Sequence, residues 1–137
     1  MSHDWKRWFE GYAADWKSGA VEAVADRYAP VFMTAAPTKT ATRNNDEAFL
    51  DWLRGVGDWH DRSGLERVEV VTTRERPLGD HHVLVSVIWA IGFRKTGSQR
   101  IQFEISYLLT GEPPRILTLL SHHDQRAAMR HYGVLPG

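Results

Sequence analysis

The sequence predicts an α+β fold in which an antiparallel meander of strands is covered by helices. Apolar side chains alternate with smaller or more polar ones along residues 83–93 and 101–109, which is typical of strands with one covered face. Turn residues separate these runs at Thr96-Gly97 and from Gly111 to Pro114. Aromatic residues recur every three or four positions in residues 5–16, which is the spacing of an amphipathic helix.

Bulk composition restricts the classes of function. The 137 residues are expected to form one domain, residues 1–137, with 42% hydrophobic and 25% charged residues. Seventeen basic and seventeen acidic side chains give a net charge of zero, which argues against nucleic-acid binding and against binding to anionic membranes. The chain has no cysteine, so disulfides and thiol catalysis are excluded. No apolar run reaches transmembrane length and no secretion signal is recognisable, so a cytoplasmic location is expected.

Two helices open the chain. The first covers residues 5–16 and ends before Gly19, because glycine adopts the left-handed conformation of a helix terminus without strain. A second short helix is expected over residues 20–28, with apolar side chains on one side. Pro30 stops it, because proline has no N–H group to continue the helical hydrogen bonds.

A short strand and a third helix follow. Residues 31–34 are expected to form the strand. Residues 35–43 are interpreted as a loop, since they contain Pro37 and several threonines. The third helix opens in residues 44–47, where Asn or Asp can accept the first N–H groups, and it ends at residues 63–64.

The second half of the chain is predicted to be mainly strands. Alternating residues and turn signals define, in order, a strand over 65–74, a turn over 77–80, strands over 81–93, 101–109 and 116–123, and a terminal helix over 125–132. Helices thus dominate the first half and strands the second, which is an α+β pattern.

Several segments resemble a known superfamily. They are Gly-Ala-Val-Glu-Ala-Val at 19–24, Tyr-Ala-Pro-Val-Phe at 28–32, the Thr96-Gly97 hairpin, and the closing strand at 114–124. In this order the chain resembles the nuclear transport factor 2-like superfamily, also called cystatin-like or SnoaL-like. The resemblance implies a curved antiparallel sheet wrapped around the N-terminal helices, forming a cone with an internal cavity. It also implies a homodimer through the open face of the sheet.

The catalytic site of the ketosteroid isomerase members carries over poorly. The resemblance places their oxyanion-hole tyrosine at Tyr12. It places their general base near Ala36, which cannot take a proton, and their protonated acid near Ser106. Steroid isomerisation by that mechanism is therefore not expected.

Four residues are candidate catalytic groups: Glu104, Tyr12, His122 and His123. Inside the cavity, Glu104 would lose solvation, which raises a carboxyl pKa and suits proton transfer. Strand alternation instead places Glu104 opposite Phe103, on a solvent or dimer face, and this alternative stays open. His122 and His123 end the last strand and face opposite ways, so at most one enters the cavity.

The remaining candidates are ligand contacts in the cavity. They are mostly aromatic: Trp16, Tyr28, Phe32, Trp52, Trp89, Ser106 and Tyr107. Neither a metal-binding spacing nor a nucleotide-binding glycine motif occurs, so no metal or cofactor is expected. Two hypotheses follow. The chain is an enzyme of the cyclase, isomerase or dehydratase type acting on a small apolar or aromatic molecule, or it is a non-catalytic binding or dimeric association module.

Overall fold

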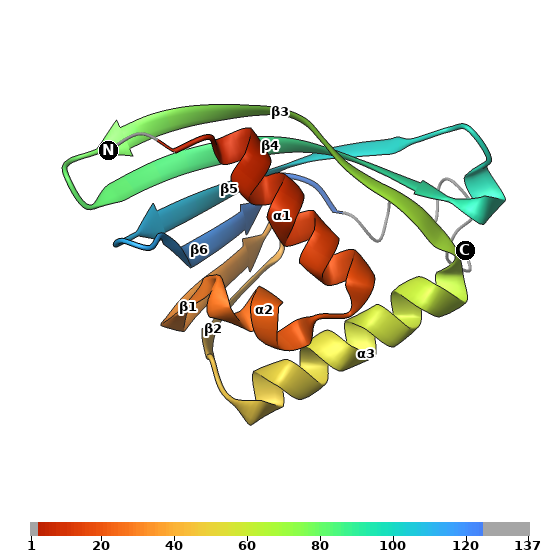
Figure 1. The fold of residues 1–137 in the computed structure, drawn as a ribbon, viewed down its shortest axis with the longest axis horizontal. Helices are drawn as coiled ribbons and strands as arrows, with labels where there is room; N and C mark the ends of the chain where they lie inside the picture. The colour runs from red at the N-terminus through yellow and green to blue at the C-terminus, as the bar shows by residue number, and fades with distance from the viewer. Residues whose placement is uncertain (1–2, 125–137) are drawn as a thin grey trace.

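A curved six-stranded sheet forms the body of the molecule in the computed structural model, which describes residues 3–124 (Figure 1). The elements in chain order are α1 (Trp5–Ser18), α2 (Val21–Asp26), β1 (Tyr28–Ala36), β2 (Lys39–Asn44), α3 (Glu47–Ser63), β3 (Leu65–Leu78), β4 (His82–Phe93), the 3-10 turn η1 (Arg94–Thr96), β5 (Ile101–Thr110) and β6 (Arg115–Ser121). The strand order is β2-β1-β6-β5-β4-β3. Neighbours are antiparallel except β1 and β6, which are parallel. The predicted α+β class is confirmed.

Capping residues define the ends of the two long helices, α1 and α3. The Asp4 side chain accepts a hydrogen bond from Arg7 N, and the Asp46 side chain accepts one from Phe49 N, each at 3.1 Å. Each cap satisfies an N–H group that the first turn leaves without a partner. Gly19 has a φ of 75° and ends α1 in the left-handed region, as predicted.

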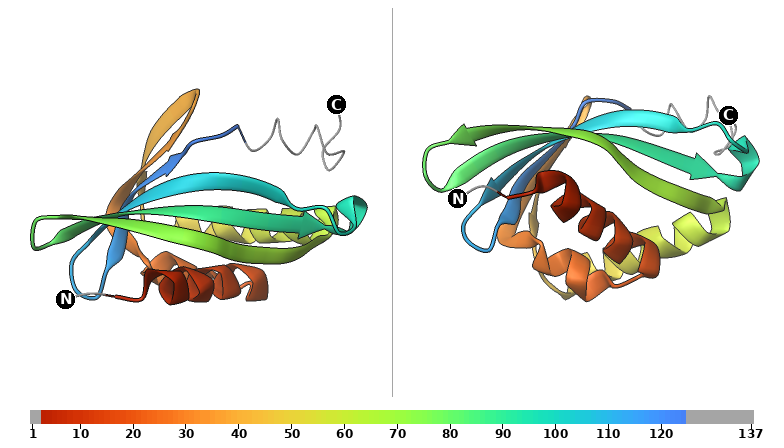
Figure 2. Two further views of the ribbon diagram at one scale, coloured as in Figure 1. Left: turned by 90° about the horizontal axis from the view of Figure 1, so that it is seen from above. Right: turned by 45° about the horizontal axis from the view of Figure 1, so that its top comes forward.

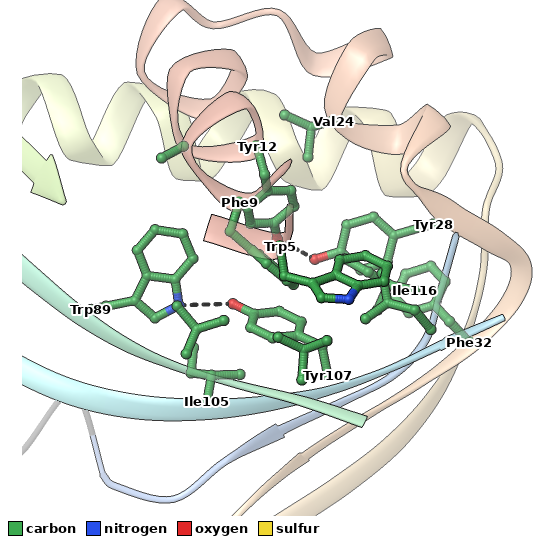
Figure 3. Packing of buried hydrophobic residues seen from close by; sticks show 14 of the residues in the cluster. Trp5, Phe9, Tyr12, Val24, Tyr28, Phe32, Trp89, Ile105, Tyr107 and Ile116 are labelled. Carbon is green, nitrogen blue, oxygen red and sulfur yellow. Dashed lines mark hydrogen bonds between the residues drawn. The ribbon is translucent and has the colours of Figure 1, made fainter. Parts of the chain in front are cut away.

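The helices lie on one side of the sheet, as the right view of Figure 2 shows. Alternate residues of the central strands point toward them. On β5, Ile105, Tyr107 and Leu109 are buried, and on β4 Val87 and Trp89 are buried opposite them. These side chains pack with aromatic residues of α1 and β1 (Figure 3). The predicted alternation of β4 and β5 is therefore confirmed.

The prediction of a loop over residues 35–43 is wrong. Residues 39–44 form β2, an edge strand paired with β1 from Val31↔Asn44 to Ala36↔Lys39. Pro37 lies in the two-residue turn between the strands, so it does not interrupt pairing. The threonines favour extended backbone. Pairing with both neighbours also lengthens β1 to Tyr28–Ala36, beyond the predicted 31–34.

Other boundaries differ in smaller ways. The second helix ends at Asp26, because Tyr28 pairs with Ile116 in the sheet. Pro77 lies within β3. This is tolerated because β3 is an edge of the sheet and proline lacks only a ladder donor. The predicted terminal helix, residues 125–132, lies outside the described residues.

None of the helices in residues 3–124 is both long and apolar enough to cross a membrane. The expected cytoplasmic location stays a prediction.

Candidate functional site

A cavity of about 590 Å³ lies against the helix-facing side of the sheet. Its walls are formed by residues of α1, all six strands and α3. The predicted ligand contacts that line it are Trp16, Tyr28, Phe32, Trp52, Trp89 and Tyr107. Of the predicted catalytic residues, Tyr12 and His123 line it. A largely apolar pocket of this size with few polar groups is typical of small-molecule sites.

Three tyrosines supply the buried hydroxyl groups of the cavity. Tyr12 and Tyr28 hydrogen-bond to each other through their hydroxyl oxygens. The indole Nε1 of Trp89 donates to the Tyr107 hydroxyl at 3.0 Å. Figure 3 shows both bonds among the buried rings. All three tyrosines are nearly fully buried, with exposed fractions of 1% to 5%.

Two of the three hydroxyl groups have a hydrogen without an acceptor among the described residues. An indole N–H only donates, so Tyr107 is the acceptor and keeps its own hydrogen. Tyr12 and Tyr28 share one bond, so one of their two hydroxyl hydrogens is also unused. Within residues 3–124, no acceptor takes either hydrogen. The cavity therefore holds two hydroxyl donors that a ligand can use.

Burial keeps these donors protonated. Desolvation is the main cause that raises the pKa of Tyr12, Tyr28 and Tyr107, because the phenolate loses more solvation than the phenol. The ordinary pKa of tyrosine is already near 10. At neutral pH the three groups are therefore neutral hydroxyls.

Glu104, Ser106 and His122 do not line the cavity, which corrects the prediction of Ser106 as a ligand contact. Their neighbours Phe103, Ile105 and Tyr107 line it. Adjacent strand residues face opposite ways, so Glu104 and Ser106 lie on the outer face of the sheet. Glu104 therefore lies on the face that strand alternation predicted and not in the cavity.

The outer-face residues form a small polar cluster. His122 Nε2 lies 2.7 Å from Ser106 Oγ and 4.0 Å from Glu104 Oε2, and Ser86 Oγ lies 2.9 Å from Ser106 Oγ. Arg74 approaches Glu104 at 3.7 Å. Both the serine and the carboxylate approach the same imidazole nitrogen. A relay in which the acid orients one nitrogen while the other activates a serine is therefore not present.

The sequence interpretation missed the wall formed by β2. Lys39, Ala41 and Arg43 line the cavity, and Arg43 Cζ lies 5.1 Å from the ring centroid of Trp52. No apolar alternation marks this segment, and the threonines at positions 40 and 42, which favour extended backbone, are its one sign of a strand. His60 of α3 also lines the cavity, and burial lowers its pKa. It is therefore a neutral imidazole at neutral pH.

Solved structures share this architecture at low sequence identity. An NTF2-like protein with a cystatin-like fold from Novosphingobium aromaticivorans matches with a TM-score of 0.69 and 14% identity, covering 93% of this chain and 84% of that one. An NTF2-like protein of unknown function from Shewanella oneidensis matches with a TM-score of 0.64 and 15% identity, covering 84% and 93%. A protein with a ketosteroid isomerase-like fold from Catenulispora acidiphila, in complex with trimethylamine, matches with a TM-score of 0.56 and 17% identity, covering 89% and 88%.

The curved sheet, its helices and the cavity between them define an NTF2-like protein. A family model described as "NTF2-like protein (DUF6841)" matches residues 3–124. The chain belongs to this family, which confirms the resemblance. No curated protein matches its sequence.

Proposed function

We propose that this protein binds a small apolar molecule carrying an oxygen that accepts hydrogen bonds. The observation that carries the proposal is the pair of unused hydroxyl hydrogens among the aromatic rings of the cavity. A buried donor without an acceptor costs free energy. A ligand oxygen that meets Tyr107, or the Tyr12–Tyr28 pair, would remove that cost. The surrounding rings would bury the apolar remainder of the ligand.

A catalytic form of the proposal assigns roles to residues on the same walls. Tyr12 would polarise the ligand oxygen, directly or through Tyr28, and His123 would carry a proton. This combination suits cyclase, isomerase or dehydratase chemistry, in which negative charge develops on an oxygen. Glu104 and His122 have no part in it, since both lie on the outer face of the sheet.

The binding proposal is tested by filling the cavity. Ala41 and Thr42 are neighbours on β2, but only Ala41 lines the cavity. We expect Ala41→Trp to abolish binding of phenylnaphthylamine, a neutral dye that fluoresces in apolar sites. Thr42→Trp adds the same side chain on the opposite face and should leave binding unchanged. Equal dye binding by both variants would show that the dye does not occupy this cavity and would overturn the proposal.

We also propose that two copies associate through the outer face of the sheet. Val31, Met33 and Leu120 are 51%, 41% and 45% exposed. Register places them on that face, beside the polar cluster around Ser106. In the described part of the chain, all three helices lie on the other side (Figure 2). Exposed apolar residues on a broad sheet favour burial against a second copy.

A further inference from the structure

Strand β2 presents two cationic side chains to the cavity. Cross-strand pairing joins Arg43 to Phe32, and Lys39 to Ala36, on the face that lines the cavity. The tyrosine hydroxyls are buried at the inner end, whereas Lys39 is exposed and Arg43 is half-buried. The two cations therefore lie at the exposed end of a largely apolar cavity.

Arg43 is held in place by aromatic packing and not by a carboxylate. Its guanidinium lies over the Trp52 ring, with Cζ 5.1 Å from the centroid. Trp52 in turn stacks on Phe49, with 6.1 Å between ring centroids and 16° between planes. No carboxylate among the described residues comes within ion-pairing distance of Arg43. Its hydrogen-bond donors are thus available to a planar anion, which a guanidinium binds in a fork.

Basic side chains outnumber acidic ones among the described residues that line the cavity. Lys17, Lys39 and Arg43 contribute positive charge, and Asp124 is the one carboxylate among the described lining residues. Asp124 already takes part in an interaction of its own. The lining therefore carries an excess of positive charge even though the whole chain is neutral. Such a field attracts an anionic ligand and repels a cationic one.

We propose that the ligand is an apolar organic acid, ionised at neutral pH, whose anionic group binds Arg43 at the opening of the cavity. This inference rests on the proposed binding function and adds the chemical class of the ligand. The apolar body lies between Phe32, Trp89 and Tyr107. The anionic group meets the guanidinium, with Lys39 adding charge from the same strand. An oxygen at the inner end of the ligand meets the unused tyrosine hydroxyls.

A matched pair of dyes tests the inference. Anilinonaphthalene sulfonate and phenylnaphthylamine share one ring system, and only the first carries an anion. We expect the wild-type protein to bind the anionic dye more tightly. Arg43→Gln should weaken the anionic dye by about tenfold or more, because a hydrogen bond to a charged group is lost. The same substitution should change the affinity for the neutral dye little, and fluorescence titration measures both.

Two further variants separate a local effect from one of net charge. Arg76→Gln removes the same charge from exposed β3, away from the cavity, and should leave both dyes unchanged. Arg43→Lys keeps the charge but loses the planar fork, so it should weaken the anionic dye to an intermediate extent.

The outcomes distinguish the two proposals. If both dyes bind and Arg43→Gln does not affect the anionic one, the anion site is refuted while the apolar cavity remains supported. An equal loss of the anionic dye in Arg76→Gln would also refute it, because the effect would then reflect total charge. If neither dye binds the wild-type protein, the binding function itself is refuted.

Discussion

Single hydroxyl groups determine which hydrogen bonds the cavity can offer. Tyr107 accepts from Trp89 at 3.0 Å, and this bond fixes the direction in which its own hydrogen is available. The resemblance to ketosteroid isomerases pointed to Tyr12, and Tyr28 and Tyr107 were predicted as aromatic ligand contacts in the cavity. Which hydroxyls bond to each other could not be predicted, since such pairing depends on distances between α1, β1 and β5 that alternation does not encode.

A ketone and its hydrocarbon analogue test the donor role of Tyr107. We expect Tyr107→Phe to weaken binding of tetralone by about 1 kcal/mol, roughly fivefold, because one hydrogen bond is lost. Binding of tetralin, which has the same rings without the oxygen, should not change. Isothermal titration calorimetry gives both affinities. Equal losses for the two ligands would mean that the variant alters cavity shape and that the hydroxyl does not bind the ketone.

At the scale of elements, the sequence predicted most of the sheet but not its β2 edge. Long apolar alternation identified β4 and β5, where one face is buried by helices. Strand β2 lacks such a signal, because its residues range from half-buried to exposed. Because residues 35–43 were predicted as a loop, Arg43 was not predicted as a residue of the cavity wall. For Glu104 the sequence left both faces of the sheet open, and the position of β5 agrees with the face that strand alternation favours.

Helix α3 carries Trp52, the ring under the Arg43 guanidinium, and Phe49, which stacks on Trp52. The first turn of α3 therefore helps to position Arg43. Asp46 caps this turn by accepting from Phe49 N at 3.1 Å. We expect Asp46→Ala to lower the free energy of unfolding by about 1 kcal/mol, because an N-terminal N–H loses its partner. Asp46→Asn retains a capping oxygen and should be nearly neutral. Urea denaturation measures both, and equal destabilisation by the two variants would contradict the capping role.

For the whole molecule, the two faces of the sheet differ in what covers them. The inner face encloses the cavity, and the outer face is proposed to bind a second copy. We expect the wild-type protein to sediment as two chains, and Leu120→Lys to sediment as one, because a buried unpaired charge is costly. Ala14→Lys, on the exposed side of α1, should leave the assembly unchanged. A monomeric wild-type protein in sedimentation velocity would refute the proposed dimer.

The position of β2 has a consequence for which molecules the protein accepts. This strand is hydrogen-bonded to β1 alone and lies at an edge of the sheet, so it is less constrained than the central strands that line the cavity. The tyrosine end is surrounded by packed rings and cannot yield without opening the core. We therefore expect the protein to select strictly for the shape of the ligand end that lies among the tyrosines. Ligands that differ in length at the end near Arg43 should be tolerated.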